Sequence, residues 1–150
     1  LVLLPGAFAG LGFDANYTYT NSREVVSESE DGVAQRDAPF QRQSPSLANI
    51  ALTYDLGPVS ARAAWAYQGA NIISYGDGSP TPSGDTYFYA HSQFDASVIV
   101  DATSRIQFQL QALNINNAVF GLFTGPTRPD SAIQREYYGR TFYFGTNAKF

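Results

Sequence analysis

The residue types that could support catalysis are few in this sequence. His91 is the only histidine, and the 150 residues include no cysteine. A histidine that acts as a general base needs a nucleophile and an orienting group beside it, and Ser92 falls on the other side if this segment is a strand. One histidine is also a poor basis for a metal site. We therefore expect no enzyme activity, no catalytic residues, no metal and no cofactor, and we interpret His91 as an exposed residue at a strand start.

A loop rich in glycine, proline and aspartate offers carboxylates that could bind calcium. Asp77 and Asp85 flank Gly78, Gly84 and two prolines. The run lacks the ligand spacing of an EF-hand. Aspartate and glycine are also the usual residues of turns, and we favour that interpretation.

Four aromatic residues of the same loop could bind a ligand: Tyr75, Tyr87, Phe88 and Tyr89. Aromatic rings on a loop could stack on a sugar ring or on an aromatic siderophore. They could equally pack the loop on itself, and both interpretations stay open here.

The composition favours a β protein. The sequence has eleven Phe, ten Tyr and one Trp, but only 15% of its residues are charged, against about a quarter in an average protein. The net charge is −4 and no block of Lys or Arg occurs, so we expect no nucleic-acid partner. The absence of cysteine excludes disulfide scaffolds and thiol catalysis. Because the sequence begins inside the apolar run LVLLPG without Met, we expect it to be a piece of a longer protein.

Six segments alternate between apolar and polar residues with the period of a β-strand. The clearest has Ile106, Phe108 and Leu110 facing one way, whereas its glutamines face the other. In the last segment, Phe142, Phe144 and Phe150 share a face. Such segments are long enough to cross a bilayer as tilted strands, which takes about 9–11 residues. The predicted strands are 11–20, 46–56, 59–68, 91–101, 105–113 and 136–150.

The connections between these segments alternate in length. Those over 21–45, 69–90 and 114–135 are long, and those over 57–58 and 102–104 are short. Outer-membrane barrels have short periplasmic turns and longer extracellular loops. We therefore predict an all-β, antiparallel up-and-down meander of about six long strands, which forms part of a transmembrane β-barrel. Its polar side would face the lumen, with the residues Arg62, Gln107, Gln109 and Gln111.

Several stretches are similar to the C-terminal part of TonB-dependent outer-membrane receptors, and they occur in the order of that family. They are Leu4-Pro5-Gly6 with Gly10-Leu11-Gly12, Ala15-Asn16-Tyr17-Thr18-Tyr19, Asn114-Ile115-Asn116-Asn117, Gln134-Arg135-Glu136-Tyr137-Tyr138-Gly139-Arg140-Thr141, and the terminal Phe150. The resemblance implies that residues 1–150 are the C-terminal fragment of a 22-stranded barrel whose plug domain is absent from this sequence. It also implies an importer of a scarce nutrient such as a siderophore, cobalamin or a carbohydrate.

The resemblance further implies a place and a set of partners. The place is the outer membrane of a Gram-negative bacterium. The partners would be the lipid bilayer, a small nutrient ligand, the TonB complex through the missing plug domain, and the outer-membrane assembly machinery. The assembly signal would lie in the last strand, in Phe142, Phe144 and Phe150.

Two other readings of the same alternation remain. A soluble β-sandwich that binds carbohydrate through its loop aromatics would show the same period of two, with one face turned to a core. A barrel hydrolase would need a catalytic set around His91, and we rank it last because no second catalytic residue is in place.

Overall fold

The computed structural model describes residues 5–27, 35–76, 84–125 and 131–150. These residues form β-strands in three antiparallel sheets, together with a 3-10 turn at Gly6–Phe8. The prediction of an all-β, antiparallel fold is confirmed. No helix in these ranges is both long and apolar enough to cross a membrane. Asp77 and Gly78, which were considered for calcium, lie outside the described residues.

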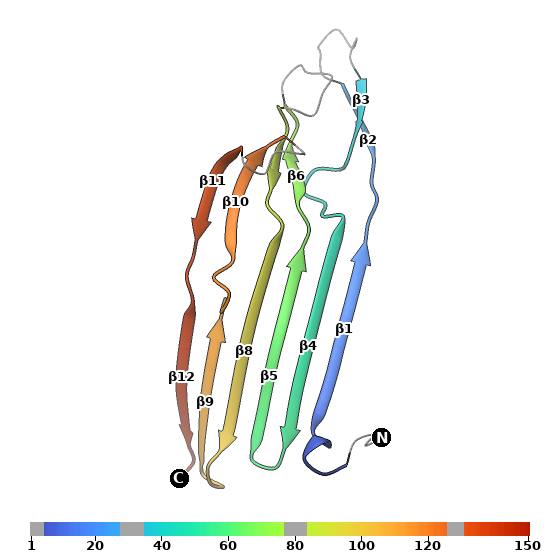
Figure 1. Cartoon of the computed structure of the whole chain (residues 1–150). Helices are drawn as coiled ribbons and strands as arrows, with labels where there is room; N and C mark the ends of the chain where they lie inside the picture. Colours follow the sequence, from blue (N-terminus) through green and yellow to red (C-terminus); the bar gives the residue numbers. More distant parts are fainter. Residues whose placement is uncertain (1–4, 28–34, 77–83, 126–130) are drawn as a thin grey trace.

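The largest sheet has six strands and follows the chain as a simple meander (Figure 1). Its order is β1-β4-β5-β8-β9-β12, and every neighbouring pair is antiparallel. The two short turns lie at the same end as the start of β1 and the end of β12, and the long connections rise from the other end. The strands are β1 (Leu11–Tyr19), β4 (Ser46–Leu56), β5 (Val59–Gln68), β8 (His91–Asp101), β9 (Ile106–Leu113) and β12 (Thr141–Ala148).

The register gives this sheet two chemically different faces. Because side chains alternate along a strand, residues paired across the strands share a face. The apolar face contains the continuous row Phe13, Leu52, Ala63, Ala96, Ala112 and Phe142. The polar face contains the next row, which is Gly12, Thr53, Arg62, Ser97, Gln111 and Tyr143.

The apolar face is uncovered in the described part of the chain. Phe13 and Phe144 are each 71% exposed, and Phe142 is 66% exposed. The fully buried apolar residues are few, and most lie beyond the upper end of the large sheet: Ala38, Ile72, Ala118 and Phe123. The large sheet is thus a single layer, and the packed core sits in the long connections above it.

The long connections contain strands, which corrects their prediction as loops. Four strands form a second sheet in the order β11-β10-β7-β6, which continues the large sheet upward (Figure 1). Two more form a separate hairpin. These strands are too short for a period to be recognised. Most pair within their own connection, and the pairing of β7 with β10 joins two different connections. The strands are β2 (Glu24–Ser27), β3 (Gln35–Ala38), β6 (Asn71–Ser74), β7 (Thr86–Phe88), β10 (Val119–Thr124) and β11 (Ala132–Tyr137).

The predicted last strand, 136–150, is wrong as one continuous element. β11 ends at Tyr137 and β12 begins at Thr141. Gly139 between them has φ +82°, a left-handed conformation that interrupts a strand and that glycine adopts without strain. The Asn114 side chain also captures the Gly139 carbonyl, at 2.7 Å from Nδ2. The chain is therefore bent here, and β11 joins the second sheet while β12 joins the first.

Candidate functional site

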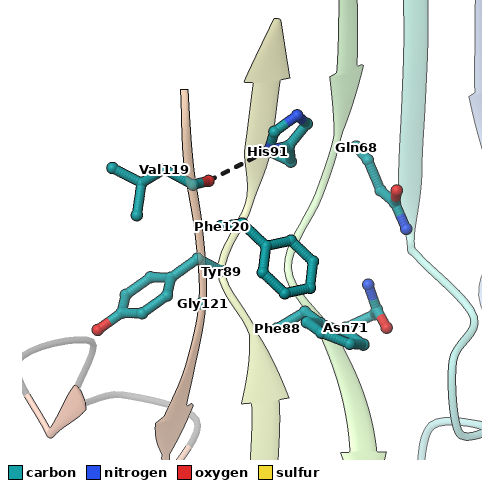
Figure 2. A pocket seen from close by; sticks show the side chains of 8 residues that line it. All are labelled: Gln68, Asn71, Phe88, Tyr89, His91, Val119, Phe120 and Gly121. Carbon is teal, nitrogen blue, oxygen red and sulfur yellow. Dashed lines mark hydrogen bonds between the residues drawn. The ribbon is translucent and has the colours of Figure 1, made fainter. Parts of the chain in front are cut away.

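A cavity of about 320 Å³ lies where the two larger sheets meet. Its size falls within the usual range for small-molecule sites, about 300–1,000 Å³. The residues that line it come from the last residue of β5, the first residues of β6, β8 and β10, and the end of β7 with the residue that follows it. Figure 2 shows all eight: Gln68, Asn71, Phe88, Tyr89, His91, Val119, Phe120 and Gly121.

The cavity lies at the upper end of the polar face. Gln68 pairs with His91 across β5 and β8, and alternation places both on the same face as Arg62. Above them, the ring of Phe88 packs against the ring of Phe120, with centroids 5.4 Å apart. In Figure 2 these side chains gather around one space, whereas the ring of Tyr89 extends away from it.

The bend between β9 and β10 brings Phe120 to the cavity. Hydrogen bonds of Asn114 stabilise this bend. Asn114 adopts a left-handed φ of 55°. Its Oδ1 accepts a hydrogen bond from the Ala118 N–H at 2.7 Å, and its Nδ2 donates to the Gly139 carbonyl. Its own N–H donates to Oδ1 of Asp95 at 2.8 Å. Asparagine tolerates the left-handed region because its short side chain hydrogen-bonds locally, so residue type and geometry agree.

Asn116 fastens the same bend to β8. Its Oδ1 accepts from the Phe94 N–H at 2.9 Å, and its Nδ2 donates to the Ser92 carbonyl at 2.6 Å. The Arg140 Nε donates to the Ile115 carbonyl at 2.7 Å. The stretch Asn114–Asn117 therefore ties the bends of three neighbouring strands together.

A buried serine supports the bend between β5 and β6. The Ser44 Oγ is 2.9 Å from the Gly69 carbonyl oxygen and 3.0 Å from that of Ser46. The Gly69 N–H donates to the Ser46 carbonyl at 2.8 Å. These contacts fix the two residues between β5 and β6, and Asn71 follows directly at the cavity wall.

Three polar side chains face this cavity. The Nδ1 of His91 lies 3.1 Å from the Val119 carbonyl, which can only accept, so Nδ1 carries the hydrogen and the neutral ring has Nε2 as an acceptor. Asn71 is 5% exposed and lines the cavity wall. Gln68 is exposed. None of the eight lining residues is a Lys, Arg, Asp or Glu.

A carboxylate stands beside the cavity, on the strand next to Phe120. Glu136 is the cross-strand partner of Phe120. It accepts hydrogen bonds from the Tyr138 hydroxyl at 2.6 Å and from Nε2 of Gln134 at 2.5 Å. These bonds lower the pKa of Glu136, and the bond to Glu136 raises the pKa of Tyr138. Glu136 is therefore charged at neutral pH.

The four predicted ligand-binding aromatics divide into two pairs. Phe88 and Tyr89 line the cavity. Tyr87 instead stacks on Phe123, with centroids 5.5 Å apart. Tyr75 packs the connections on themselves: its hydroxyl contacts the Glu24 carboxylate and lies 2.7 Å from the Pro39 carbonyl. The Tyr89 ring extends away from the cavity and packs against Phe123, with centroids 4.8 Å apart. The loop-packing interpretation therefore describes the rings of Tyr75, Tyr87 and Tyr89, and the ligand-binding interpretation remains for Phe88.

The residues predicted to face a lumen share the polar face below the cavity. Arg62 and Gln111 lie in one row, and Gln109 and Gln107 follow on the same side of β9. Arg62 lines a hollow together with Asp14 and Asp95. Gln107 accepts from Asn147 at 3.1 Å and donates to Asp101 at 2.8 Å, near the end with the short turns. None of the four reaches the cavity.

Five cavity residues were not predicted from the sequence as site residues: Gln68, Asn71, Val119, Phe120 and Gly121. His91 was interpreted as an exposed rim residue, but it is partly buried and lines the cavity. The available signal was the apolar run Val119–Thr124, which is short and rich in aromatic and β-branched residues.

No protein-family model matches this chain, and neither a curated protein nor a solved structure does. The described residues contain no group of three or more His, Asp or Glu side chains placed to hold a metal ion. Function must therefore be argued from the two faces of the sheet and from the cavity.

Proposed function

We propose that this chain is part of the barrel of a TonB-dependent outer-membrane receptor, and that it lies in the C-terminal portion of that barrel. The observation that carries the proposal is the six-stranded single layer with one uncovered apolar face, one polar face and all long connections at one end. Membrane barrels combine these three features.

The uncovered face needs an apolar environment. Soluble monomers rarely expose apolar patches larger than a few hundred Å². Here an apolar row crosses all six strands. Further large apolar side chains lie on the same face, two positions along each strand from this row. Burial stabilises by about 25 cal/mol per Å² of apolar surface, so lipid contact would stabilise this sheet strongly. The exposed apolar residues include Phe13, Ile50, Leu52, Phe108, Leu110, Phe142 and Phe144.

The two outer strands need pairing partners. In the described sheet β1 pairs only with β4, and β12 pairs only with β9. An unpaired strand edge in lipid leaves backbone N–H and C=O groups unsatisfied, each at a cost of several kcal/mol. Further strands must close the sheet, and the resemblance supplies a 22-stranded barrel for them.

The proposed role follows from this placement. The polar face, with Arg62, would line the lumen, and the cavity would lie near its extracellular end. Uptake would be driven through the TonB complex acting on a plug domain. The exposed side chains of Phe142, Phe144 and Phe150 would be read by the outer-membrane assembly machinery.

A soluble carbohydrate-binding β-sandwich is the second candidate. A sandwich buries its apolar face beneath a second sheet. In the described residues the four-stranded sheet extends the six-stranded sheet end to end rather than covering it (Figure 1). This arrangement favours the membrane proposal.

The test is refolding of the 150-residue chain from urea, with and without phosphatidylcholine liposomes. We expect β-structure, by circular dichroism, that floats with the liposomes and resists extraction with alkaline carbonate, with the edges β1 and β12 paired between copies of the chain. A folded, monomeric protein that stays in detergent-free buffer and does not bind the liposomes would contradict the proposal and support the sandwich.

A further inference from the structure

We propose that the cavity binds a neutral carbohydrate, with one pyranose ring seated between the phenylalanines and the amides. This inference deepens the proposed function, because it selects one nutrient class for the importer. The inference depends on the proposed function in one respect only, which is that the cavity lies above the lumen of a barrel.

The first argument is the aromatic wall. Phe88 and Phe120 present adjacent rings, and Phe120 is backed by Tyr138 at 5.9 Å between centroids. The face of an aromatic ring carries partial negative charge. One face of a pyranose ring is a cluster of slightly positive C–H groups, so the two surfaces are complementary in shape and in charge.

The second argument is the set of hydrogen-bonding groups. A sugar hydroxyl donates one hydrogen bond and accepts others, so it pairs with amides, which do both, and with a neutral imidazole nitrogen. Gln68, Asn71 and His91 provide these groups around one space (Figure 2). Asn71 is the most buried of the three, with 5% of its surface exposed.

The third argument is charge. The eight lining residues include no Lys or Arg to pair with an anionic iron chelate, and the ionised carboxylate of Glu136 lies on the neighbouring strand. An anionic ligand would therefore be repelled. The volume of about 320 Å³ is at the lower end of the range for small-molecule sites, which suits a single ring better than a large macrocycle such as the corrin of cobalamin.

The experiment is saturation-transfer NMR on the full chain refolded in lauryldimethylamine oxide, a detergent without a sugar headgroup. The probes are the methyl glycosides of glucose, galactose and N-acetylglucosamine, with ferric acetohydroxamate and citrate in competition. We expect saturation of the ring C–H protons of at least one glycoside, unaffected by either competitor. Absence of transfer to all three glycosides, or displacement by citrate, would overturn the inference.

Three variants locate the binding. Phe120→Ala removes half of the aromatic wall and should weaken binding at least about fivefold. Gln68→Ala changes an exposed side chain that the fold does not need, and should weaken binding about threefold by loss of hydrogen bonds. Phe13→Ala, on the apolar face, is the matched control and should leave binding unchanged. Equal transfer in Gln68→Ala and wild type, with both folded by circular dichroism, would place the sugar elsewhere and overturn the inference.

The two proposals fail separately. A chain that floats with liposomes but binds no glycoside contradicts only the carbohydrate inference. A chain that is a soluble monomer and binds a glycoside through Gln68 contradicts only the receptor proposal.

Discussion

The Nη2 of Arg36 lies 2.5 Å from the Oδ1 of Asp85, and their side chains are only 11% and 1% exposed. This ion pair joins β3, in the first long connection, to the residue that precedes β7 in the second. The Gly76 N–H donates to the same carboxylate oxygen at 2.9 Å, and the Arg36 guanidinium lies over the ring of Tyr75 at 5.5 Å. This buried charge pair therefore helps to hold together two connections that are far apart in sequence.

Removing one partner of this pair should loosen the upper connections. Asp85→Ala removes the buried carboxylate that pairs with Arg36, and we expect a loss of up to about 3–5 kcal/mol in the free energy of opening of the β2–β3 hairpin. Amide hydrogen exchange of Glu24–Ser27 measures it. The double variant Arg36→Met with Asp85→Leu should recover part of the loss. If the double variant loses as much as the sum of Arg36→Met and Asp85→Leu measured singly, the pair is not coupled.

Two tyrosines of these connections should ionise late. Burial raises the pKa of Tyr75 and of Tyr87, with the Glu24 and Asp85 carboxylates adding to the effect. Both lie outside the six-stranded sheet. Because the folded-state pKa exceeds that of the unfolded chain, their stabilisation is complete below about pH 10 and is lost as the pH rises further.

Absorbance at 295 nm during an alkaline titration tests this expectation. We expect a late tyrosinate component that shrinks by one residue in Tyr75→Phe and by one in Tyr87→Phe. Tyr17→Phe is the control, because Tyr17 belongs to β1 and not to the long connections that hold Tyr75 and Tyr87. A late component of unchanged amplitude in both loop variants would show that other tyrosines produce it.

Asn114 should be harder to replace than Asn117, although both have left-handed backbones with φ of 55° and 50°. Asn114→Gly keeps the backbone freedom but removes two side-chain hydrogen bonds, at a cost of about 1–3 kcal/mol in the free energy of unfolding. Asn114→Ala should cost about 1–2 kcal/mol more, because a Cβ disfavours this conformation.

Asn117→Gly is the matched control, because the Asn117 Oδ1 is buried without a partner among the described residues. Its unfolding free energy in urea should change little or rise. Equal losses of unfolding free energy in Asn114→Gly and Asn117→Gly would mean that the side-chain hydrogen bonds of Asn114 do not contribute to stability, and that only the backbone conformation matters at these positions.

Adjacent alanines of β5 should respond oppositely to charge. Ala63 lies in the apolar row and Ala64 on the polar face. Lys on a lipid-facing side near the bilayer middle costs about 2–4 kcal/mol, so Ala63→Lys should reduce the folded fraction in liposomes. Ala64→Lys, beside Asp95 in the register, should be tolerated. Similar folded fractions, measured by gel mobility before and after heating, would indicate that neither face meets lipid.

Most of the six-stranded sheet was predictable, because its faces are determined locally. In Ile106–Leu113 every second residue is apolar, and the register then aligns those residues with the neighbouring strands. The break at Gly139 was not predictable, because it involves a hydrogen bond from Asn114, which is 25 residues away in the sequence. The three residues of β7 form a strand only because β6 and β10 pair with them.

The candidate site was predictable only in part for the same reason. Phe88 was recognised as an aromatic in a long connection, but its partner Phe120 comes from another connection that showed no period. Asn71 has no sequence feature that marks it as a site residue, because its burial beside the cavity depends on the tertiary structure. Strand pairing between different connections brings these residues together, and the local sequence pattern does not predict this pairing.

The most direct test of the central claim uses the natural absence of cysteine to compare Ala63→Cys with Ala64→Cys in liposomes. Each thiol is labelled with an environment-sensitive fluorophore and exposed to a doxyl-lipid quencher or to aqueous iodide. We expect quenching by doxyl lipid for Ala63→Cys and by iodide for Ala64→Cys, as required for a sheet with one face in lipid and one facing a water-filled lumen. Quenching by iodide alone at both positions would contradict a membrane-spanning sheet.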